Sequence, residues 1–79
     1  GYLKALSMTK IILIMYLCSG IPGNRCGIIP TPTVLFNDHY DCMVYGYDYS
    51  LNLIKSFDRK WVNEKRAFTK FTCKIEHII

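Results

Sequence analysis

The sequence predicts a small α+β domain in which two or three strands pack on one long helix. Three observations predict it: an amphipathic stretch over residues 37–57, a continuous apolar run over residues 10–18, and an alternating apolar–polar segment over residues 67–76. We expect the order strand–strand–helix–strand with antiparallel pairing. A simple strand–helix–strand unit is the alternative.

The helix over residues 37–57 has recognisable start and packing signals. Asn37 can act as its N-cap by accepting from a free backbone N–H. Gly46 costs about 1 kcal/mol relative to Ala inside a helix. A strand approaching closely at that point would explain the glycine, and simple tolerance of a poor residue is the alternative. The apolar stripe recurs every three or four residues and comprises Cys42, Gly46, Tyr49 or Ser50, Leu53 and Phe57.

The apolar run over residues 10–18 has two interpretations. Its length and β-branched content are typical of a buried strand. Alternatively, residues 8–20 form a signal peptide, with Lys10 before the apolar stretch and small residues after it. The run is too short to cross a bilayer as a helix. We prefer the strand, because without it the helix would have only one good strand on which to bury its stripe.

Residues 19–33 are rich in turn-forming glycine and proline. Gly23 and Asn24 could turn a hairpin from the first strand. A short edge strand is expected near residues 31–35, since proline is excluded from central strands.

Two elements follow the long helix. Asp58 can cap a short basic helix over residues 58–65. The strand over residues 67–76 then alternates cleanly, as a half-buried strand does. Its core-facing side chains are expected to be Thr69, Phe71, Cys73 and Ile75.

At 79 residues the chain is long enough for one domain. We expect residues 1–7 to be a non-native or disordered leader, because Met8 opens a natural-looking start, and residues 8–79 to form the domain. The net charge of +4 lies entirely from Lys55 onward, where seven basic residues face three acidic ones. This asymmetry permits an anionic partner, although such a run is more often a solvated face.

The four cysteines allow three disulfide pairings. Their spacing favours Cys18–Cys26 across the glycine-rich loop and Cys42–Cys73 between the helix and the last strand. In the chain-entropy model these bridges contribute about 2.5 and 3.5 kcal/mol. Free thiols packed as small hydrophobic groups are the first alternative.

A metal site is the second alternative for the cysteines. Its tetrahedral ligands would be His39, Cys42, Cys73 and His77. The spacing is not that of a known zinc module. No C-x-x-C motif occurs, which argues against a thioredoxin-like redox role.

Four stretches, ILIMYLCS, FNDHYDCMVYGY, WVNEK and FTKFTCKIE, lie within residues 8–76. Together they resemble small cysteine-containing proteins of marine bacteriophages and marine viral metagenomes, and the resemblance covers nearly all of residues 8–76. The second stretch is the most specific, with Phe36, Tyr40, Cys42, Gly46 and Tyr47 in place. The resemblance implies a viral origin and a cysteine framework, and it brings no activity with it.

We expect a non-enzymatic protein without a cofactor. Cys42 beside His39 has no third orienting group, and the glycines do not form a phosphate-binding loop. A nucleic-acid site is more plausible, with Phe68, Tyr45 or Tyr49 stacking on bases. Its basic residues would be Lys55, Arg59, Lys60, Lys65, Arg66, Lys70 and Lys74.

The sequence thus favours a small viral accessory protein that binds a host or virion protein, without a membrane span. A minor nucleic-acid-binding protein is one alternative. A secreted disulfide-rich protein with residues 8–20 as its signal peptide is another. The expected location is the host cytoplasm or the virion, or the periplasm or exterior in the last case. No motif names the partner, the oligomeric state or the stage of infection.

Overall fold

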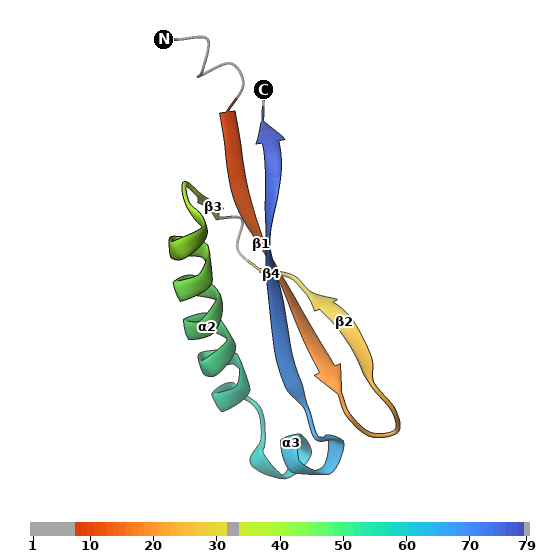
Figure 1. Cartoon of the computed structure of the whole chain (residues 1–79). Helices are drawn as coiled ribbons and strands as arrows, with labels where there is room; N and C mark the ends of the chain where they lie inside the picture. Colours follow the sequence, from red (N-terminus) through yellow and green to blue (C-terminus); the bar gives the residue numbers. More distant parts are fainter. Residues whose placement is uncertain (1–7, 32–33, 79) are drawn as a thin grey trace.

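A four-stranded antiparallel sheet carries one long helix on one of its faces (Figure 1). This computed structural model describes residues 8–31 and 34–78, so the expectation for residues 1–7 lies outside the described residues. The α+β class is confirmed. The elements, in chain order, are β1 Met8–Ser19, β2 Arg25–Ile29, β3 Leu35–Phe36, α2 His39–Ser56, α3 Arg59–Lys65 and β4 Phe68–Ile78.

Strand β1 is the centre of the sheet, as its uninterrupted apolar run leads one to expect. β4 pairs antiparallel with it along one edge, from Met8 opposite Ile78 to Cys18 opposite Phe68. β2 and β3 share the other edge of β1. The strand interpretation of residues 10–18 is confirmed. Removal of residues 8–20 as a signal peptide would take away the strand with which all the others pair.

The sheet has four strands where two or three were expected, and β2 is the strand that was not predicted. Gly23, with φ of 95°, belongs to the turn that reverses the chain after β1, so the anticipated hairpin does form. Its second strand contains Gly27, which disguises a strand in the sequence but is tolerated at a sheet edge. The short strand expected near 31–35 lies at Leu35–Phe36 instead.

Asp38, not Asn37, caps helix α2, so the predicted N-cap was wrong by one residue. The Asp38 carboxylate accepts from the backbone N–H of Asp41 at 2.9 Å. Asn37 lies outside the helix, where its side-chain oxygen accepts from the Lys10 ammonium. The helix consequently runs over His39–Ser56 rather than 37–57.

The predicted stripe of α2 is buried in its first half, whereas Tyr49, Ser50 and Leu53 further along it are only partly buried. Cys42 and Gly46 are buried in α2. A Cβ at position 46 would lie 2.6 Å from Cδ2 and Cζ of the Phe71 ring, so the close approach of a strand to this glycine is confirmed. Among the side chains that the structure describes, the apolar ones with less than a tenth of their surface exposed are few: Ile11, Met15, Cys18, Phe36 and Cys42. So small a core leaves the domain dependent on cross-links.

Helix α3 closes the end of the sheet that lies furthest from the start of β1 and the end of β4 (Figure 1). Asp58 caps it as expected, accepting from the Trp61 N–H at 3.2 Å. The Gly20 N–H donates to the carbonyl oxygens of Lys65 and Arg66 at 2.9 and 3.2 Å. These bonds fix α3 to the chain just after β1.

Candidate functional site

The four cysteines form the two pairs that their spacing favours. Cys18 and Cys26 join β1 to β2 with an S–S distance of 2.11 Å. Cys42 and Cys73 join α2 to β4 with an S–S distance of 2.12 Å. The structure describes all four residues and leaves none as a free thiol, which differs from the first alternative.

The alternative metal site is not assembled by the residues that the structure describes. Cys42 and Cys73 are bonded to each other and present no thiolate. Among the described side chains no group of three His, Cys, Asp or Glu residues is arranged to hold a metal ion. The side chain of His77 lies outside the described part. The same bond removes the Cys42 thiol from any pairing with His39 as a nucleophile.

Alternation along β1 divides its apolar side chains between two faces of the sheet. Ile11 and Met15 are buried, and Leu13 packs on the cluster formed by Ile11, Phe36 and Cys42. These odd-numbered positions therefore lie beneath α2. The even-numbered positions of β1 face the opposite side.

The face of the sheet turned away from α2 is apolar and exposed at its margins. Strand register places Ile28 and Lys70 beside Tyr16, and Leu35 beside Ile12. Ile28 is 69% exposed, Leu35 47% and Phe68 41%. We call this surface the outer face; it comprises Ile12, Ile14, Tyr16, Ile28, Leu35, Phe68, Lys70 and Lys74.

Lysines border the outer face. The Lys70 ammonium lies 5.5 Å from the centre of the Tyr16 ring. The Lys74 ammonium lies 3.5 Å from a Glu76 carboxylate oxygen, and both side chains remain well exposed. An exposed pair of this kind is worth at most about 1 kcal/mol, so Lys74 stays available to a partner.

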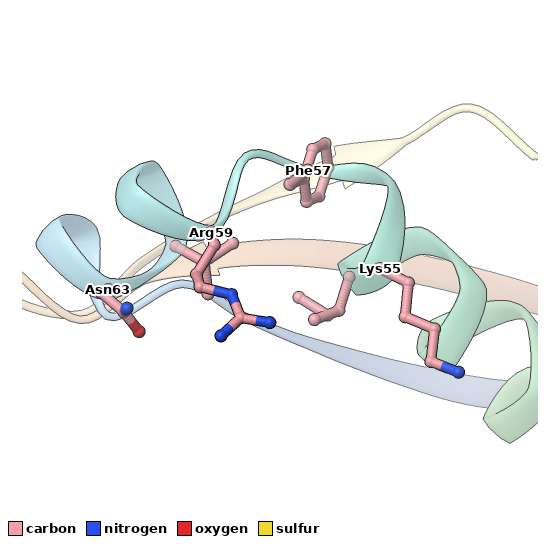
Figure 2. Close-up of a pocket in the computed structure, with 6 residues that line it drawn as sticks. Lys55, Phe57, Arg59 and Asn63 are labelled. Carbon is pink, nitrogen blue, oxygen red and sulfur yellow. The ribbon is translucent and has the colours of Figure 1, made fainter.

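The seven basic residues predicted for nucleic acid are spread over three elements. Lys70 and Lys74 border the outer face, and Lys60, Lys65 and Arg66 belong to α3 and its C-cap. Figure 2 shows Lys55 from α2 and Arg59 from α3 beside a hollow of about 270 Å³, which Ile54, Phe57, Val62 and Asn63 also line. The structure thus does not bring all seven into one track.

Two of the three aromatic residues proposed to stack on bases have structural contacts instead. Tyr45 lies 5.3 Å from Phe36, centre to centre, and stacks on Tyr49 at 5.9 Å. Both tyrosines are half-buried. Only Phe68 remains exposed, on the outer face.

Comparison with protein-family models, curated proteins and solved structures found no match. Within residues 8–31 and 34–78, neither helix is apolar enough over a sufficient length to cross a membrane.

The sequence prediction did not recognise the outer face as a candidate site. A signal was present, however: β1 is apolar at successive positions, which is typical of a strand covered on both faces. The chain supplies one long helix, and that helix covers only one face. Placing Ile28 and Leu35 beside β1 required the strand register.

Proposed function

We propose that this chain is a small non-enzymatic binding protein whose outer face contacts a partner protein. The observation that carries the proposal is the imbalance between two apolar faces of β1 and one covering helix. Exposed apolar patches rimmed by polar residues mark interaction sites on soluble proteins. The exposed Ile28, Leu35 and Phe68, bordered by Lys70 and Lys74, form such a patch.

The chemistry of the outer face favours a protein over a nucleic acid. Its apolar part is mainly aliphatic, through Ile12, Ile14, Ile28 and Leu35. Sequence-independent nucleic-acid sites instead depend on aromatic rings that stack with bases. The lysine border favours acidic groups around the apolar contact of the partner. The expected partner surface is therefore apolar with an acidic rim.

The resemblance to viral proteins supports a more specific role within this proposal. A viral accessory protein would present the outer face to a host or virion protein, in the host cytoplasm or in the virion. The non-enzymatic character is supported by the bonded state of Cys42, the residue considered as a nucleophile.

Selection from a random peptide library on the immobilised protein tests the proposal and requires no candidate partner. We expect enrichment of peptides that combine aliphatic or aromatic anchors with Asp or Glu. A labelled synthetic peptide of the enriched type is then titrated against the wild type, Ile28→Asp and Leu51→Asp. Ile28 and Leu51 are both exposed, at 69% and 54%, but only Ile28 lies on the outer face.

Ile28→Asp should weaken peptide binding at least tenfold, whereas Leu51→Asp should leave it unchanged. Equal binding to both variants would contradict the assignment of the outer face. Titration with labelled oligothymidine distinguishes the nucleic-acid alternative. Tight oligothymidine binding that falls steeply with salt and requires Lys70 and Lys74 would replace the proposed protein partner with a nucleic acid.

A further inference from the structure

We propose that the chain forms a twofold homodimer in which the outer edge of β4 pairs antiparallel with β4 of a second copy. β1 pairs with one edge of β4 along the whole strand. Within the described residues no other strand pairs with the opposite edge. Such an edge presents a row of backbone N–H and C=O groups that can pair with another chain. β4 contains no proline that would interrupt this row.

The charges along β4 select one register for this pairing. A twofold axis normal to the sheet keeps the two helices on the same face, so only positions of the same face can be opposite each other. When the axis passes through Cys73, Phe68 lies opposite Ile78 and the whole of β4 is paired. Lys70 then lies opposite Glu76 of the second copy, and the same pair recurs across the axis. Opposite charges at facing positions stabilise an antiparallel pair.

Other registers do not combine opposite charges at facing positions with pairing along the whole of β4. An axis through Thr72 places Lys70 opposite Lys74, and an axis through Lys74 places that lysine opposite itself. Like charges directly opposite each other destabilise strand pairing. An axis through Ile75 pairs Lys74 with Glu76 but leaves the start of β4 unpaired. The register centred on Cys73 therefore combines full overlap with opposite charges.

Helix α2 lies over the same edge of the sheet. The Tyr47 ring meets Phe71 of β4 edge to face, with 5.0 Å between the ring centres. The Met43 sulfur lies 3.9 Å from the Cys73 sulfur. The opposite side of α2 contacts β3 instead, through Tyr45 on Phe36. Met43 and Tyr47 thus identify the side of α2 that would face a second copy.

On that side of α2 the exposed apolar side chain is Tyr47, which is 65% exposed and lines a hollow with Met43 and Phe71. Tyr40 and Val44, also exposed, lie instead beside Phe36 and Tyr45 on the β3 side of the helix. The twofold axis would bring a second α2 alongside, at roughly 10 Å given the strand spacing, which is the distance at which helices pack. The axis passes through Cys73, which is bonded to Cys42 in the first half of α2. The first halves of the two α2 helices would therefore lie next to each other at the axis.

The dimer would also cover an apolar residue of β4 that is exposed in the single chain. Ile75 is 62% exposed although its register partner on β1 is the buried Ile11. In the Cys73-centred register Ile75 lies opposite Phe71 of the second copy. The same symmetry operation therefore covers Tyr47 of α2 and Ile75 of β4.

Charge reversal tests the interface and its register together. Sedimentation velocity over a concentration series should give the wild type a mass twice that of the 9.2 kDa chain. Lys70→Glu and Glu76→Lys should each weaken association by about tenfold or more, because each places like charges opposite each other at two symmetry-related positions. An equimolar mixture of the two variants should recover the dimer, since both facing pairs become opposite in sign.

Lys74→Glu is the matched control, because it makes the same charge change on the same strand but faces Thr72 in this register. It should weaken association much less than Lys70→Glu does, because it removes only the exposed contact of Lys74 with Glu76 of the same strand and creates no like-charge pair directly across the interface. A monomeric wild type at all concentrations would overturn the proposal, as would a mixture of Lys70→Glu and Glu76→Lys that stays monomeric. Loss of association in Lys74→Glu with retention in Lys70→Glu would overturn the register. Peptide binding at Ile28 does not require association, so the two proposals can fail separately.

Discussion

The two faces of the sheet share the central strand β1 but differ in what covers them. Beneath α2, Met15 is fully buried and the Cys42–Cys73 disulfide ties the helix to the sheet. On the outer face, Cys18–Cys26 ties a hairpin together and large apolar residues remain in solvent. Both faces are apolar in sequence. Apart from Cys18, which is buried and disulfide-bonded on the outer face, coverage by a helix rather than hydrophobicity separates residues that hold this fold from residues available for binding.

Substitutions of Met15 and Ile14 should show the largest difference in stability between the two faces, because these neighbouring residues lie on opposite faces of β1. Met15→Ala should lower the free energy of unfolding by about 2–5 kcal/mol, since it leaves a cavity in the core. Ile14→Ala, at a half-buried position, should cost only about 1 kcal/mol. Urea denaturation measures both. Similar losses for the two variants would contradict the division of β1 into a covered and an uncovered face.

The two disulfides provide the next comparison. Cys42→Ala/Cys73→Ala opens a loop with a sequence separation of 31, whereas Cys18→Ala/Cys26→Ala opens one of 8. In the chain-entropy model the losses of unfolding free energy should be about 3.5 and 2.5 kcal/mol. Denaturation of the two double variants tests the ranking. A greater loss from the hairpin bridge would mean that chain entropy does not decide their relative contributions.

Gly46→Ala sharpens the account of the covered face. Helix propensity alone predicts stabilisation by about 1 kcal/mol. The Phe71 ring leaves no room for a Cβ, so we expect destabilisation by about 1–3 kcal/mol instead.

A double-mutant cycle with Phe71→Leu identifies the cause of that loss. The smaller side chain should recover part of it, giving a coupling of at least about 0.5 kcal/mol between the two positions. Stabilisation by Gly46→Ala in the wild-type background would show that the ring and the helix backbone are not in close contact.

Local patterns in the sequence were sufficient to predict much of this fold. The helical stripe containing Cys42 and Gly46, the alternation of β4 and the spacing of the cysteines each depend on residues near one another or on one recurring period. β2 was missed because Gly27 weakens the strand pattern, and pairing with β1 decides its structure. The N-cap was misplaced by one residue because Asn37 and Asp38 are both good caps.

Less of the candidate site could be predicted. Lys70 and Lys74 were recognised as basic residues of a half-buried strand. Their position beside Tyr16 and Ile12 depends on strand register, which joins residues far apart in the chain. Of the aromatic residues considered for binding, Tyr45 is half-buried against Phe36, a contact that depends on where α2 meets β3.

Hydroxyl-radical labelling read by mass spectrometry tests the contrast between the two faces most directly. Met15 and Phe68 are compared in the folded protein, with and without the library-selected peptide. Methionine is readily oxidised when exposed. We predict that the fully buried Met15 stays unlabelled while Phe68 is labelled, and that the peptide suppresses labelling of Phe68. Labelling of Met15 at the rate of the unfolded chain, or a Phe68 signal unchanged by bound peptide, would contradict the account.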